Sequence, residues 1–74
     1  MPKVEIIVKI DDAFQAKMSQ IADECKAAGM SVEQQMSAIG MISGAIERSG
    51  ISKLEQITGV SYVEEAKAIK NQAG

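Results

Sequence analysis

Hydrophobic and polar residues alternate at the start of the chain and then recur with helical spacing. In KVEIIVKI, residues 3 to 10, a period of two places β-branched residues on one face and Glu5, Ile7 and Lys9 on the other, which predicts a strand. Over residues 12 to 28 the apolar positions follow a helical repeat. We expect Asp12 to cap this helix, with Gln15 three residues on, and Gly29 to end it.

The stretch MSVEQQMSAIGMISGAIE predicts a hairpin rather than a second long helix, because Ser37, Gly40 and Gly44 weaken a helix. We place its loop near residues 37 to 40. The outward residues of the hairpin are expected to be Gln35, Met41, Ser43 and Ala45, with Ile39 at the loop. The glycines of GMISG are expected to allow a bulge or close packing, and a phosphate-binding loop is excluded by its context.

A short helix is expected to open at Ser49 or Gly50 and to end at Gly59, with Ile51, Leu54 and Ile57 facing inward. The following VSYVEEAKAI is interpreted as an edge strand or an extended tail. We expect Tyr62 to be a partly buried aromatic residue that closes the end of the sheet.

These elements follow the order β, α, β, β, α, β and predict an α+β, ferredoxin-like fold. Two right-handed βαβ crossings interleave into a four-stranded antiparallel sheet of order 4-1-3-2, with both helices on one face. The 74 residues form a single domain in this prediction, with 67–74 as a flexible tail. The other face of the sheet is left without a helix to cover it.

Composition and charge argue against several classes of function. The net charge of −2, with acidic and basic residues interspersed, lacks the basic patch of a nucleic-acid binder or a polybasic membrane face. The single Cys25 cannot form an internal disulfide, and the N-terminal apolar run is too short for a signal peptide or a membrane span. We therefore expect a cytoplasmic protein. We also expect it to bind no metal or cofactor, since the chain contains no histidine.

The stretch GVSYVEEAKAIK, residues 59–70, resembles the end of the subtilisin-propeptide-like protease inhibitor family, whose members carry a VEED motif and an apolar tail. The segment GAIERSGISKLEQITGVSYVEE resembles that family's third strand, second helix and fourth strand. The segments VEIIVKIDD and AAGMSV resemble its first strand and its glycine-containing turn, so the resemblance covers nearly the whole chain.

The family resemblance implies docking on a subtilisin-like serine protease. The open sheet face would contact two helices of the protease, and acidic residues of the motif would cap their N-termini, where N–H groups and the helix dipole favour an anion. Glu64 occupies the first capping position, and Ala66 replaces the family's aspartate, which leaves Glu65 as a substitute. The implied contact residues are Ile7, Ile39 and Met41 on the face, Glu64 and Glu65, and Ile69, Lys70, Asn71 and Gln72 in the protease cleft.

A second resemblance is to short, largely cyanobacterial proteins that share an AAGMxVEQ…IGxISGxI pattern and are often called ketohydroxyglutarate aldolases. That activity is not expected here, because a Schiff-base lysine must be buried with a lowered pKa and every lysine of this chain lies on a polar face or at an end. The chain is thus predicted not to be an enzyme. The alternative is a small regulatory or structural domain that forms a homo-oligomer through the sheet face or the edge strand and has no protease target.

Overall fold

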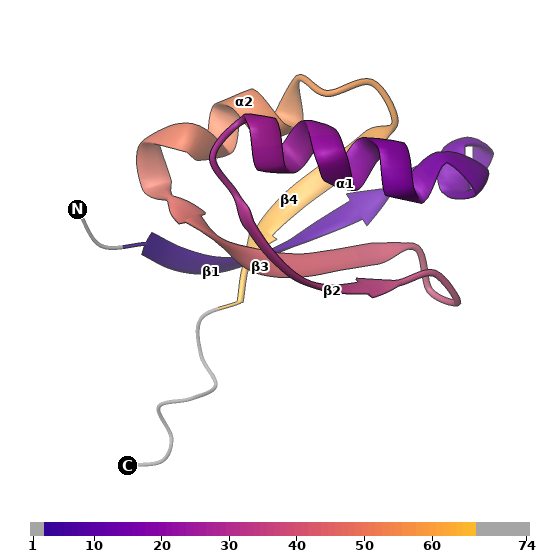
Figure 1. Ribbon diagram of the computed structural model, residues 1–74, viewed down its shortest axis with the longest axis horizontal. Helices are drawn as coiled ribbons and strands as arrows, with labels where there is room; N and C mark the ends of the chain where they lie inside the picture. The colour runs from indigo at the N-terminus through magenta and orange to yellow at the C-terminus, as the bar shows by residue number, and fades with distance from the viewer. Residues whose placement is uncertain (1–2, 67–74) are drawn as a thin grey trace, which may run out of the picture.

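The chain folds into one antiparallel sheet with two helices packed on one of its faces (Figure 1). The computed structural model describes residues 3–66. The strands are β1 (Lys3–Ile10), β2 (Ser31–Met36), β3 (Met41–Glu47) and β4 (Val60–Glu65). Their order is β2-β3-β1-β4, which is the predicted order 4-1-3-2 read from the opposite edge. The predicted α+β, ferredoxin-like fold is confirmed.

The longer helix has two parts. A 3-10 segment, η1 (Asp12–Lys17), leads into α1 (Met18–Ala27), whereas the sequence predicted a regular helix over residues 12 to 28. The cap is Asp11 rather than Asp12, because the Asp11 carboxylate accepts the Ala13 N–H at 3.0 Å. Asp12 instead accepts the Gln15 side-chain amide at 3.2 Å. These local bonds favour tight turns over a regular first helical turn.

The end of α1 and the second helix follow the sequence closely. Gly29 has φ +108° and ends α1, as predicted. The second helical region consists of a 3-10 turn, η2 (Arg48–Gly50), and α2 (Ile51–Glu55), so the α-helix ends earlier than expected. Leu54 is fully buried, and Ile57 packs against the core from the turn that follows.

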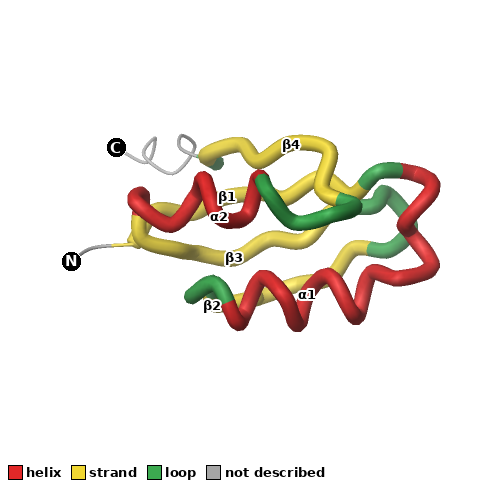
Figure 2. Tube along the Cα trace, turned by 90° about the horizontal axis from the view of Figure 1, so that it is seen from above, coloured by secondary structure: helices red, strands yellow, loops and turns green. Residues whose placement is uncertain are grey.

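The core lies between the helices and one face of the sheet. Figure 2 shows α1 along the β2 side of the sheet and α2 nearer β1 and β4. The buried core residues are all apolar: Ile6, Val8, Ile10, Met18, Ile21, Ala22, Cys25, Met30, Ile42, Ile46 and Leu54. Burial of one such side chain stabilises the fold by about 1.5–3 kcal/mol, so this single layer provides most of the driving force for folding.

Two features shape the β2–β3 hairpin. The register shifts between Val32 and Gln34, so that Gln34 pairs with Ser43, and Gln35 pairs with Ile42. Such a shift places Gln34 on the open face and Gln35 on the helix-covered face, and the expectation that Gln35 faces outward is therefore wrong. The loop falls at residues 37–40, as predicted.

Gly44 allows β3 to approach the start of β2. A Cβ at this position would clash with the Ser31 carbonyl oxygen and would lie 2.9 Å from the terminal methyl of Met30. The Ser31 oxygen belongs to the backbone and cannot move aside without distorting the sheet. The predicted role of this glycine in close packing is confirmed.

The substitution Gly44→Ala should therefore destabilise the protein by about 1–3 kcal/mol, the usual cost of forcing extra atoms into a packed site. Urea denaturation followed by circular dichroism would measure the change. Ser43→Ala, one residue away on the open face, is the matched control and should have little effect. Equal stability of Gly44→Ala and the wild type would show that the strands have room to separate.

Candidate functional site

The uncovered face of the sheet is the main candidate site. Among the described residues, both helices lie on one side of the sheet and none lies on the other (Figure 1). The strand pairing defines three rows of neighbouring side chains across this open face. One row contains Tyr62, Lys9, Met41 and Met36, and the next contains Glu64, Ile7, Ser43 and Gln34. The third row contains Glu5, Ala45 and Ser31, with Ala66 beside Glu5 through the Ala66 N–H to Glu5 carbonyl bond of 2.9 Å.

Three of the residues predicted for binding share this face. Ile7 and Met41 are both partly exposed, and Glu64 pairs directly with Ile7 from the neighbouring strand. Glu64 is exposed. The structure therefore brings a carboxylate next to an apolar centre on the side of the sheet that no helix covers.

Ile39 lies at the end of the sheet, in the turn between β2 and β3. Its side chain is 52% exposed, and its carbonyl accepts a hydrogen bond from the Lys9 ammonium at 3.0 Å. This bond ties the turn to the central strand. It leaves the Lys9 ammonium with further N–H donors for a partner.

Glu65 does not share a face with Glu64. Side chains alternate along a strand, and Glu65 pairs with the buried Ile6 on the helix side. Its carboxylate accepts two hydrogen bonds from Arg48, from Nε and Nη2, both at 3.2 Å. This bidentate pair joins the end of β4 to η2. Ile69, Lys70, Asn71 and Gln72 lie outside the described residues.

Sequence reasoning missed Tyr62 and Gln34 as members of the open face, whereas it placed Met36, with Met41, where a partner would meet them. Tyr62 is 46% exposed rather than partly buried at the end of the sheet, because it lies on the outer face of an edge strand. The alternation of side chains along β4 would have placed Tyr62 on the same face as Glu64. No sequence signal identifies the bulge that brings Gln34 and Met36 to this face.

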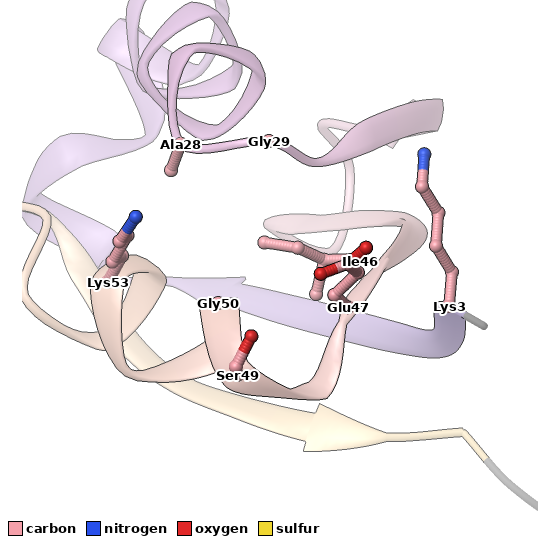
Figure 3. A pocket seen from close by; sticks show the side chains of 8 residues that line it. All are labelled: Lys3, Ala28, Gly29, Ile46, Glu47, Ser49, Gly50 and Lys53. Atoms are coloured by element: carbon pink, nitrogen blue, oxygen red, sulfur yellow. The ribbon is translucent and has the colours of Figure 1, made fainter. Parts of the chain in front are cut away.

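A small pocket lies on the other side of the molecule, between the end of α1 and η2 (Figure 3). Its volume is about 260 Å³, slightly below the usual size of small-molecule sites. Lys3 and Lys53 lie on opposite sides of it, and the Lys3 ammonium donates to the Ser31 hydroxyl at 2.8 Å. None of its lining side chains is a buried polar group, so the pocket lacks the fixed donors and acceptors that orient a ligand.

Within residues 3–66, no group of three His, Cys, Asp or Glu side chains could hold a metal ion. Cys25 is fully buried, and burial, together with the nearby Glu24 charge, raises its pKa from 9.0 to about 11. A thiol in this state is a poor nucleophile.

None of the described helices is both long enough and apolar enough to cross a lipid bilayer. No protein-family model matches the chain, and no curated protein matches it. The resemblance to subtilisin propeptides accordingly stays a prediction.

The raised pKa predicts how Cys25 reacts. At pH 8 a thiol of pKa 11 is about 100-fold less ionised than one of pKa 9.0, so the native protein should react with an aromatic disulfide reagent at least about 100-fold more slowly than the denatured chain. The absorbance of the released thiol measures both rates. Equal rates would mean that Cys25 is accessible and ionised in the fold.

The same shift predicts a pH dependence of stability. The folded state disfavours the Cys25 thiolate, so the contribution of this group is fully present below about pH 9 and is lost as the pH rises toward about 11. Urea denaturation between pH 8 and pH 11 should show a steeper loss of stability in the wild type than in Cys25→Ala. The other titrating groups are common to both proteins, and identical slopes would contradict the prediction.

Proposed function

We propose that this chain is a non-catalytic binding domain that docks on a subtilisin-type serine protease through its open sheet face and inhibits it. The observation that carries this proposal is the position of Glu64. It projects from the last strand, beside Ile7, on the face that no helix covers, and it directly precedes the C-terminal part of the chain.

An exposed carboxylate in this position suits the N-terminus of a helix on a partner. Such a terminus presents unpaired N–H groups and a partial positive charge, and both stabilise a bound anion. Ile7 lies beside Glu64 on β1, and Met41 lies on the same face, one strand further away on β3 and level with Lys9. Both supply apolar contact area on the face that carries the charge. The C-terminal residues Ile69 to Gln72 would enter the protease cleft as an added strand, which is an inference from the family resemblance.

The Arg48–Glu65 pair limits the strength of this docking. Glu65 was predicted as a second capping group, but its carboxylate is bonded to Arg48 on the helix side of the sheet. Of these two glutamates, only Glu64 then offers its charge to the proposed partner from the open face. We therefore propose a weaker inhibitor than a domain with two capping carboxylates.

The test is a titration of a subtilisin with the full-length protein while the enzyme hydrolyses a chromogenic peptide. The wild type should slow hydrolysis at about micromolar concentration, and a chain that ends at Ala66 should inhibit less. Glu64→Gln should weaken inhibition about 10-fold or more, since hydrogen bonds to charged groups contribute about 1.5–3 kcal/mol.

Glu55→Gln is the matched control, because Glu55 is exposed on α2, on the opposite side of the molecule. It should inhibit like the wild type. If the wild type does not slow hydrolysis at micromolar concentration, the protease is not the partner. If Glu64→Gln and Glu55→Gln inhibit equally, Glu64 is not part of the contact.

A further inference from the structure

The open face is complementary to itself in charge. β1 is one of the two central strands, and its side chains Lys3, Glu5, Ile7 and Lys9 face this side, so that the three around its centre run in the order negative, apolar, positive. Two copies of the strand that lie antiparallel, with Ile7 over Ile7, bring each Glu5 opposite the Lys9 of the other copy. The dimer therefore contains two ion pairs, each between Glu5 of one copy and Lys9 of the other.

The open face is also complementary to itself in size. The two strands that flank β1 place the large side chains Tyr62 and Met41 beside Lys9. They place the small side chains Ala66 and Ala45 beside Glu5. The antiparallel arrangement that pairs the charges also sets Met41 over Ala45 and Tyr62 over Ala66, so that each bulky side chain meets a small one.

We propose that the open face binds a second copy of this chain in a symmetric, face-to-face dimer. The two-fold axis runs across the strands, so each strand lies antiparallel over its own copy in the partner and the same patch is used on both sides. The two sheets form a sandwich of the aligned type, in which mean strand directions differ by about 30°.

The area of the face predicts a weak dimer. Strands of six to eight residues at about 3.3 Å per residue, and four strands about 4.8 Å apart, give roughly 400 Å² per face. The dimer would bury roughly 800 Å² in total, which is less than the 1,200 Å² or so typical of stable complexes. We expect a monomer at about 10 µM and a substantial dimer fraction at about 1 mM.

Glu64 opposes this dimer. It lies level with Ile7 on the edge strand β4, so the same symmetry brings the two Glu64 side chains toward each other at the rim. Twist separates the edges of stacked sheets and lets water screen this pair, so the repulsion weakens the dimer without preventing it.

The dimer would regulate the docking site, because a face covered by a second copy is closed to a protease. This consequence rests on the proposed function, whereas the dimer itself does not. Glu64 would stabilise the contact with a protease and would destabilise the dimer. Glu64→Gln should weaken the inhibition of a protease and strengthen the dimer.

Charge reversal tests the arrangement. Glu5→Lys sets a positive charge over Lys9 of the other copy, and Lys9→Glu sets a negative charge over Glu5 of the other copy. Sedimentation velocity at about 1 mM and low ionic strength should show the dimer in the wild type and its loss in each single variant. The double variant Glu5→Lys/Lys9→Glu should dimerise again, and an equimolar mixture of the two single variants should form a mixed dimer.

The controls are Glu55→Lys and Lys53→Glu, which make the same changes of charge at exposed positions on α2 and should dimerise like the wild type. Circular dichroism would confirm that all variants are folded. A wild type that is monomeric at about 1 mM overturns the proposal, as does a double variant that stays monomeric or a single variant that still dimerises. None of these outcomes bears on protease inhibition, which is measured separately at about micromolar concentration.

Discussion

Burial of one side of β1 is the constraint on which the rest of the structure depends. β1 pairs with both β3 and β4, and its residues Ile6, Val8 and Ile10 are almost completely buried beneath the helices. Because side chains alternate along a strand, the residues between them must face the opposite side. Both helices are used to cover the apolar side, so the intervening residues form the centre of an open face. The surface offered to partners is thus a direct consequence of how the core is made.

The hairpin decides which residues complete that face. Gly44 lets β3 pass close to the Ser31 backbone, and the bulge in β2 then reverses the orientation of the residues that follow. Met36 lies beside Met41 on the open face as a result, and Gln35 lies on the helix side. On β4, strand alternation likewise separates two adjacent glutamates, because Glu64 faces outward while Glu65 is held by Arg48.

The chemistry of the open face suits two partners that exclude each other. A foreign helix N-terminus would be attracted by the exposed carboxylate of Glu64. A second copy would instead match Glu5 with Lys9 and large side chains with small ones, and it would be opposed by Glu64. The balance between the two contacts therefore depends on one carboxylate and on concentration. Both contacts use the same surface, the face of the sheet that none of the described helices covers.

The sequence by itself determined the order of the elements, the strand order and the side of β1 that is buried, because the period of two in KVEIIVKI and the helical spacing after it are local signals. It also indicated Ile7 and Met41 on the open face, and the family resemblance assigned Glu64 to the same contact. Only the tertiary structure decided the 3-10 start of the first helix, the β2 bulge and the pairing of Glu65 with Arg48. Some of these features depend on contacts between distant residues, such as Arg48 with Glu65 and Gly44 with Ser31. Others depend on local hydrogen bonds around Asp11 that compete with a regular helix. A periodic pattern of hydrophobic residues contains information on neither.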